Sequence, residues 1–244
     1  MENIYFKEIK NIKIIDKEIL SKDPRKSIIF IDIDNTLLRT ETDIGSDEWI
    51  KWQLQLLDEH NGEHKHCIIK EKLDIFDYYH KWLLKANYNI GLVEDDMPNI
   101  FNKYISLGYK VVLITARNKC ISDVTFEHLQ KYYDTNSFYC QNIKLEFGDI
   151  IFKNGIYFAA GTNKGLAIKF ILSIIKNING FLPEFIFFID DSLRECSNVK
   201  VTFNNHKKYK MFIFHYTHAE KFQILFDQLD KDNLHTKWLK FISE

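Results

Sequence analysis

The sequence predicts an α/β fold, in which a doubly wound, mainly parallel sheet carries an inserted helical segment. Short apolar runs at 27–33, 110–115, 185–190 and 210–214 are typical of strands that are buried on both faces. Segments with helical spacing of apolar residues lie between these runs, and such alternation indicates parallel β-α units. A length of 244 residues allows one large core with room for an inserted subdomain.

The elements before the second buried run are mostly helical. Residues 1–26 mix apolar and charged positions and are expected to form an N-terminal extension that packs on the core. Ser46 can cap a helix that ends near Asn61-Gly62, because serine favours the N-cap and Asn-Gly the C-terminal end. Two further helices are expected over 73–86 and 98–107. We therefore assign the insert to residues 41–96.

The remaining elements complete the core, which we assign to 27–40 and 97–244. Four segments are expected between and after the buried runs: a helix over 120–132, a short strand over 137–140, a hairpin within 143–159, and a final helix over 218–230. Another helix is expected over 166–178, with Thr162 as its N-cap and Gly180 as its C-terminal stop.

Polar side chains collect where three of the buried runs end. These clusters are Asp32–Thr36, Thr115–Arg117 and Asp190-Asp191. In open α/β sheets ligands bind outside the carboxyl ends of the strands, so the three clusters should face one crevice. Carboxylates brought together there repel unless a proton or a cation neutralises them, and oxygen-only ligands suit Mg²⁺. Taken singly, each cluster could instead cap a turn or a helix.

Lys164 is expected just inside the start of the helix over 166–178. A lysine is locally unfavourable there because the helix dipole places positive charge at the N-terminus. A helix N-terminus combined with a lysine is nevertheless a good anion site. The alternative is a solvated lysine that points away from the helix.

The chain resembles the haloacid dehalogenase (HAD) superfamily in four motifs, which occur in the order Asp32-x-Asp34-x-Thr36, Thr115, Lys164 and Asp190-Asp191. The resemblance implies a Rossmann-like core with a helical cap. It also implies that Asp32 is the nucleophile that forms an aspartyl-phosphate, and that Asp34 is first the general acid and then the base for water. Thr115 and Lys164 would hold the transferring phosphoryl group.

The resemblance also implies a Mg²⁺ site. Asp190 would bind the ion together with the Asp32 carboxylate and the Asp34 backbone carbonyl. Asp191 would be either a ligand through water or an orienting neighbour. The acid at position 34 points to phosphatases and phosphomutases, because dehalogenases lack an acid two residues after the nucleophile and transport ATPases have threonine there.

Two further residues are assigned to substrate binding, Thr36 and Arg117. The form Thr115-Ala116-Arg117 is similar to that of phosphatase branches of the superfamily. For Arg117 the sequence leaves two alternatives open, because its side chain could contact the substrate or pair with a carboxylate of the core.

The insert is expected to be the cap that selects the substrate. Its aromatic residues could line the pocket or pack in the core: Trp49, Trp52, Tyr78, Tyr79 and Trp82. They favour phosphotyrosine or another aromatic phosphate, carried by a small molecule or a phosphoprotein, while a sugar or nucleotide phosphate stays open. His60, His64 and His66 suggest either a metal site or a surface loop.

Composition restricts the other functions. Lysine and arginine total 33 against 34 acids, so a general nucleic-acid binder is not expected. No apolar run approaches the ~18 residues of a membrane-spanning helix, and four cysteines without a C-x-x-C pair suit the reduced thiols of a cytoplasm. The rivals are a phosphomutase and a regulatory module whose segment 235–241 contacts a protein or a lipid. A bacterial origin with export into a host, and the oligomeric state, stay open.

Overall fold

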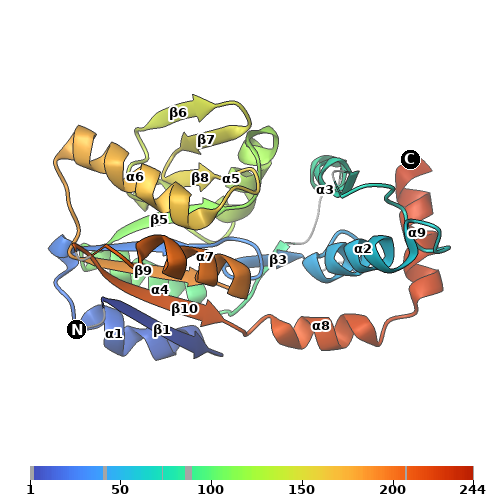
Figure 1. Cartoon of the computed structure of the whole chain (residues 1–244), viewed down its shortest axis with the longest axis horizontal. Helices are drawn as coiled ribbons and strands as arrows, with labels where there is room; N and C mark the ends of the chain where they lie inside the picture. The colour runs from blue at the N-terminus through green and yellow to red at the C-terminus, as the bar shows by residue number, and fades with distance from the viewer. Residues whose placement is uncertain (1–2, 41–42, 73, 86–89, 207, 244) are drawn as a thin grey trace. The chain divides into compact units, whose positions relative to one another are not determined.

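The computed structural model, shown in Figure 1, describes residues 3–40, 43–72, 74–85, 90–206 and 208–243. The chain forms two compact units. The sheet unit comprises Met1–Leu38 and Leu92–His218, and the helical unit comprises Arg39–Gly91 and Ala219–Glu244. Within the described residues, every helix is too short or too polar to cross a bilayer.

The sheet unit contains eight strands in the order β1-β10-β9-β2-β5-β8-β7-β6. Their bounds are β1 (Ile4–Ile9), β2 (Ser27–Ile31), β5 (Lys110–Thr115), β6 (Lys144–Phe147), β7 (Ile150–Lys153), β8 (Ile156–Phe158), β9 (Phe185–Asp190) and β10 (Lys210–Tyr216). Pairing is parallel from β1 to β8, while β7 and β6 are antiparallel. This mainly parallel sheet with flanking helices confirms the predicted α/β class.

Helices of the sheet unit follow its strands. They are α1 (Asp16–Leu20), α4 (Met97–Ser106), α5 (Ser122–Gln130), α6 (Lys164–Asn179) and α7 (Leu193–Phe203). The central strands β2 and β9 are almost wholly buried because their apolar side chains alternate between two covered faces. Ile28 and Phe30 of β2 point into one core cluster with α6 and α7, so these two helices cover the same face of the sheet.

The N-terminal segment was predicted to be an extension that packs on the core, and in the structure it contributes the edge strand β1 to the sheet. Strand β1 extends the sheet by pairing in parallel with β10, from Ile4 opposite Met211 to Ile9 opposite Tyr216. Glu94 anchors the next turn, because its carboxylate accepts hydrogen bonds from the Asn11 side chain at 2.9 Å and from the Ile12 amide at 2.8 Å.

The helical unit contains α2 (Asp47–His60), α3 (Asp74–Lys85), α8 (Glu220–Asp227) and α9 (Lys231–Ser243). A short ribbon of β3 (Leu38–Thr40) and β4 (Ile90–Leu92) carries the chain between the units. As predicted, Ser46 caps α2 by accepting a hydrogen bond from the Trp49 amide at 3.2 Å, and Asn61 ends it in a left-handed conformation.

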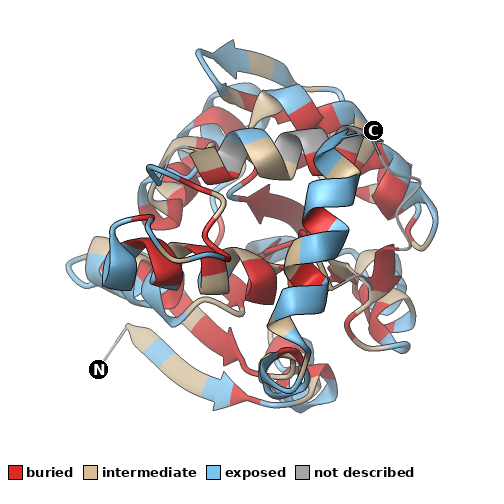
Figure 2. Cartoon of the chain, turned by 90° about the vertical axis from the view of Figure 1, so that its right-hand side faces the viewer, coloured by how far each residue is buried: buried red, intermediate tan, exposed pale blue. Residues whose placement is uncertain are grey.

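The C-terminal helices correct the predicted division of the chain. Residues 219–244 were assigned to the core, but they cluster with the inserted helices. The physical reason is burial of Trp238, whose ring lies 4.7 Å from that of Trp49 and 5.4 Å from that of Tyr78. Helix α9 buries Leu234 and Trp238 and leaves its other residues half-buried or exposed, as Figure 2 shows, so within the segment 235–241 it is Trp238 that packs in the helical unit.

Three local predictions also differ from the structure. The strand expected over 137–140 is replaced by a 3-10 turn at Thr135–Ser137 and by Cys140 in a left-handed conformation. The helix expected over 218–230 is present as the shorter α8, and a separate helix, α9, begins at Lys231. The N-cap of α6 is Asn163, whose side chain accepts a hydrogen bond from the Leu166 amide at 3.1 Å, and Thr162 does not have this role.

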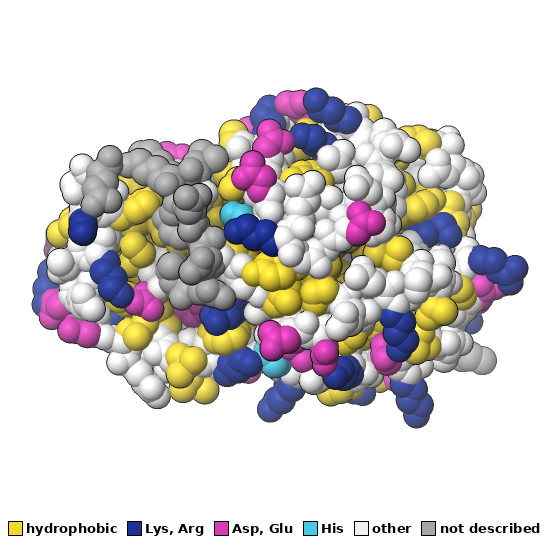
Figure 3. Space-filling model, turned by 180° about the vertical axis from the view of Figure 1, so that it is seen from behind, with side chains coloured by type: hydrophobic (Ala, Val, Ile, Leu, Met, Phe, Trp, Pro, Cys, Tyr) yellow, Lys and Arg dark blue, Asp and Glu magenta, His cyan; other side chains and the backbone are white. Residues whose placement is uncertain are grey.

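The surface shows no large region of one charge on the face drawn in Figure 3. Side chains of both signs are interspersed among the described residues of that face. This distribution agrees with the net charge of −1 for the whole chain.

Candidate active site

Three adjacent strands bring three of the predicted site residues together. Strands β9, β2 and β5 are neighbours in the sheet and parallel, so their carboxyl ends lie at one edge. Thr115 and Asp190 are the last residues of β5 and β9, and Asp32 directly follows β2. All three side chains are buried, with relative exposures of 0% for Thr115 and Asp190 and 4% for Asp32.

Lys164 completes this buried cluster. It is the first residue of α6, and the Asn163 cap fixes the start of that helix. Its Nζ donates hydrogen bonds to Asp32 Oδ1 at 2.5 Å and to Asp190 Oδ2 at 2.7 Å. Lys164 is only 3% exposed, so the alternative of a solvated lysine does not apply.

The charges in this cluster do not balance. Burial raises the pKa of Asp32 well above its ordinary value and raises the pKa of Asp190, although the Lys164 ammonium opposes both shifts. Burial alone would lower the pKa of Lys164, but the two carboxylates outweigh it and raise that pKa. When all three groups are ionised, two negative charges face one positive charge in a site with little water to screen them.

A third carboxylate makes the cluster suitable for a divalent cation. Asp32, Asp190 and Asp191 each offer one oxygen atom, and the three atoms lie within 4.8 Å of one another. Oxygen donors with surplus negative charge are what Mg²⁺ prefers. Across the described ranges, this is the one group of three or more acidic, histidine or cysteine donors close enough to share an ion.

Thr36 connects two of the motif loops. Its Oγ1 donates to Asp32 Oδ2 at 3.3 Å and accepts a hydrogen bond from the Asp191 amide at 3.2 Å. The turn that presents Thr36 needs Asn35 in a left-handed conformation, with φ at 57°, which asparagine tolerates better than most residues. Thr36 therefore braces the loop after β2 against the loop after β9.

Arg117 pairs with Asp34. The guanidinium donates from Nε to Asp34 Oδ2 at 3.0 Å and from Nη2 to Oδ1 at 2.6 Å. Thr115 Oγ1 also lies 3.4 Å from Asp34 Oδ2. Of the two alternatives that the sequence leaves open for Arg117, the structure shows the pairing with a carboxylate.

Three residues that sequence reasoning missed surround this site. Glu195 is buried on α7 and accepts a hydrogen bond from the Lys164 amide at 3.2 Å, which helps to fix the start of α6. Thr125 on α5 accepts a hydrogen bond from Arg117 Nη1 at 2.9 Å. His128 is also buried on α5, and burial, with Arg117 nearby, lowers its pKa to about 4. The helix predicted over 120–132 included Thr125 and His128, whereas no helix was predicted around Glu195, and the sequence carried no signal of what these three residues contact.

The aromatic and histidine residues of the insert pack within the helical unit. Trp49 and Trp82 are buried to about 1% exposure or less, so the core alternative applies to these two. His66 Nε2 lies 2.8 Å from Asp232 Oδ1, and the ring of His60 stacks on that of His64. No group of donors suited to a metal ion includes these histidines in the described part of the chain.

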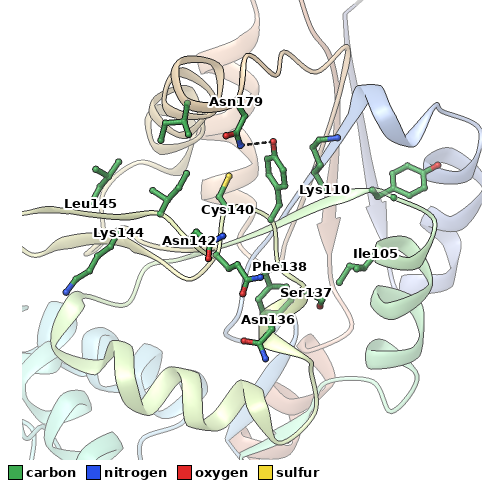
Figure 4. Close-up of a pocket in the computed structure, with 16 residues that line it drawn as sticks. Ile105, Lys110, Asn136, Ser137, Phe138, Cys140, Asn142, Lys144, Leu145 and Asn179 are labelled. Atoms are coloured by element: carbon green, nitrogen blue, oxygen red, sulfur yellow. Dashed lines mark hydrogen bonds between the residues drawn. The ribbon is translucent and has the colours of Figure 1, made fainter.

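A separate cavity of about 810 Å³ lies at the other end of β5 and is drawn in Figure 4. It is lined in part by Lys110, Cys140, Lys144 and Asn179. Lys144 points away from the other labelled side chains, so the cavity does not gather charged groups around one point. None of the residues assigned to the carboxylate cluster lines it.

Comparisons with known proteins place the chain in one family. The family described as "Protein of unknown function (DUF2608)" matches residues 8–242. No curated protein matched this chain in a sequence comparison.

Solved structures of similar fold include proteins from Legionella pneumophila and Clostridium difficile. The HAD domain of the effector protein Lem4 from Legionella pneumophila has 16% sequence identity, with 87% of this chain and 97% of that chain covered at a TM-score of 0.40. A candidate phosphatase from Clostridium difficile has 14% identity, with 82% and 98% covered at a TM-score of 0.45. Similarity at this level does not carry an activity from one protein to another.

Proposed function

We propose that this chain, which belongs to the DUF2608 family, is a HAD-type, Mg²⁺-dependent phosphomonoester hydrolase that acts through a phosphoryl group on Asp32. One observation carries the proposal. Two buried carboxylates, of Asp32 and Asp190, meet the buried ammonium of Lys164 at 2.5 and 2.7 Å, at the carboxyl ends of parallel strands. Such a cluster costs free energy to bury, and phosphoryl transfer uses its parts: a nucleophile, a cation, and carboxylates that can hold a metal ion.

The donor set fits Mg²⁺. Asp32, Asp190 and Asp191 would hold the ion, since their oxygen atoms lie within 4.8 Å of one another and Lys164 leaves part of their charge unbalanced. When bound, Mg²⁺ supplies positive charge that stabilises the phosphoryl oxygens and lowers the repulsion met by an approaching dianion.

In the first proposed step, a carboxylate oxygen of Asp32 attacks the phosphorus atom. A bond forms between Asp32 and phosphorus, and the bond from phosphorus to the leaving oxygen breaks. Asp34 gives its proton to that oxygen, so the product leaves as an alcohol or a phenol. Lys164 and Thr115 stabilise the phosphoryl oxygens by charge and by hydrogen bonding.

In the second proposed step, water attacks the phosphorus atom and Asp34 takes a proton from that water. The bond between Asp32 and phosphorus breaks, inorganic phosphate leaves, and the Asp32 carboxylate is restored. Asp34 thus ends the cycle protonated, as it began.

The substrate that we propose to test first is an aryl phosphate such as phosphotyrosine. Three aromatic residues of the helical unit, Trp52, Tyr78 and Tyr79, are only half-buried and are suited to contact an aromatic ring. The four cysteines are free thiols, which supports our proposal that the protein works in a reducing compartment such as the cytoplasm.

Hydrolysis of p-nitrophenyl phosphate tests the proposal. Asp32→Asn should lower kcat/KM by roughly 10⁴-fold or more, because it removes the nucleophile. Chelation should abolish the activity and added Mg²⁺ should restore it. Acid-quenched wild-type protein should carry a phosphoryl group on Asp32 in peptide mass spectrometry.

Asp123→Asn is a matched control. The Asp123 side chain is exposed and pairs with Lys153 on the surface, so its amide variant should keep wild-type activity. Activity that survives Asp32→Asn or exhaustive chelation would contradict the proposal.

A further inference from the structure

We infer that Arg117 acts on Asp34 and not on the substrate, and that Thr125 is the residue that positions Arg117 for this task. The inference rests on the proposed function, in which Asp34 transfers protons. It assigns a role to Thr125, and it chooses between the two roles that the sequence leaves open for Arg117.

The guanidinium of Arg117 is held on two sides. Nε and Nη2 donate to the two carboxylate oxygens of Asp34 at 3.0 and 2.6 Å, and Nη1 donates to Thr125 Oγ1 at 2.9 Å. The Arg117 side chain is only 2% exposed. A bidentate pair of this kind fixes the plane of the carboxylate as well as its distance. Three of the guanidinium's N–H groups are thus directed at protein atoms.

Thr125 gives this arrangement a rigid support. Its hydroxyl donates to the Ile121 carbonyl at 2.7 Å, one turn earlier in the chain, so the oxygen is left to accept from Arg117. Thr125 is fully buried on α5, and its branched side chain has few rotamers. The backbone amide of Arg117 is held as well, because it donates to Thr115 Oγ1 at 3.1 Å.

For catalysis, this support fixes the direction in which Asp34 presents its carboxylate oxygens. The Asp34 side chain is 24% exposed, so part of it reaches the surface while the buried Arg117 side chain holds its carboxylate plane. A displacement of about 1 Å can cost a reaction about 10²-fold, so a loosened Asp34 should transfer its proton less well. A residue that binds the substrate phosphoryl group would have a different effect, because it would change affinity equally for every phosphate ester.

Leaving groups of different basicity separate these two roles. A weakly basic leaving group such as p-nitrophenolate hardly needs a proton, whereas an alkoxide needs one. We would compare p-nitrophenyl phosphate with β-glycerol phosphate, in the presence of Mg²⁺, for wild type, Thr125→Val and Thr125→Ser. The inhibition constant of inorganic phosphate would be measured for each variant.

For Thr125→Val we expect kcat/KM on β-glycerol phosphate to fall at least about tenfold and kcat/KM on p-nitrophenyl phosphate to fall less than about threefold, because kcat/KM does not include the later attack of water that both esters share. The inhibition constant of phosphate should stay within about twofold of wild type. Thr125→Ser keeps the hydroxyl and should recover most of the activity. Thr217→Val is a matched control, because Thr217 is also buried but its hydroxyl donates to the Ile9 carbonyl.

Arg117→Lys gives the same test if Thr125→Val does not fold, since lysine keeps the charge and loses the fork geometry. The inference is overturned if either variant weakens phosphate inhibition and lowers kcat/KM equally for both esters. It is also overturned if both variants match wild type on both esters. A wild-type protein no more active than Asp32→Asn would refute the proposed function, and this inference with it.

Discussion

Replacing Lys164 by methionine should destabilise the sheet unit, because it leaves two buried carboxylates without their cation. Nζ of Lys164 lies 2.5 Å from Asp32 Oδ1 and 2.7 Å from Asp190 Oδ2, and no more than 4% of any of the three residues is exposed. Methionine keeps the length and apolar part of the side chain, so the change removes the charge and leaves most of the packing.

The expected loss can be estimated from burial. Removing one partner of a buried ion pair costs about 3–5 kcal/mol, because the other charge is left unpaired. Lys164 serves two carboxylates, so we expect the upper part of this range at pH 8 without metal. Protonation limits the loss, since burial already raises the pKa of both aspartates and removal of the ammonium raises these pKa values further.

The sign of the pH dependence follows from these shifts. A carboxyl group whose folded-state pKa lies above its unfolded value stabilises the fold most when it is protonated, and this contribution is lost as the pH rises through the folded-state pKa. The raised pKa of Lys164 gives wild type a contribution that is complete below the ordinary lysine pKa of 10.5. The difference between wild type and Lys164→Met should therefore shrink from pH 8 to pH 5.

Urea denaturation in EDTA followed by far-UV circular dichroism measures this difference, because the four tryptophans all belong to the helical unit and would not report on the sheet unit. Lys210→Met is a matched control, because Lys210 Nζ lies 3.4 Å from Glu184 Oε1 and the lysine side chain is 59% exposed. Such a surface pair is worth less than about 1 kcal/mol. A loss below about 1 kcal/mol for Lys164→Met at pH 8, or an equal loss at pH 5, would refute the reasoning.

Three further predictions concern stability and use the same denaturation assay. Burial lowers the pKa of His128 from 6.5 to about 4, so the free energy of unfolding should fall by up to about 3 kcal/mol from pH 6.5 to pH 4. His128→Gln should remove that part of the slope, and an unchanged slope would contradict the assignment. In Gly165→Ala the new Cβ would lie 2.4 Å from Thr202 Oγ1. We expect a loss of about 1–3 kcal/mol that Thr202→Ala partly restores. Trp238→Ala should cost about 3–5 kcal/mol, because Trp238 is 1% exposed. Leu239→Ala, at a position 48% exposed, should change stability much less, and equal losses would exclude burial as the cause.

Local sequence patterns were sufficient for the main strands and for the acidic end of the sheet. The apolar runs at 27–33, 110–115 and 185–190 predicted β2, β5 and β9 because a strand covered on both faces must be apolar at nearly every position. The meeting of Asp32 with Asp190 could also be predicted, since the carboxyl ends of adjacent parallel strands share an edge.

The division of the chain and the partners of individual side chains depended on long-range packing. The last two helices join the helical unit because Trp238 finds a buried partner in Trp49, which lies far away in the sequence. Periodicity gives the apolar face of a helix but not the surface that this face covers. The same limit applies at the site. Arg117 has two partners there, Asp34 and Thr125, and they come from different segments of the chain. Side-chain chemistry alone allowed Arg117 either a substrate or a carboxylate, and the observed pair with Asp34 depends on the three-dimensional positions of α5 and the loop after β2.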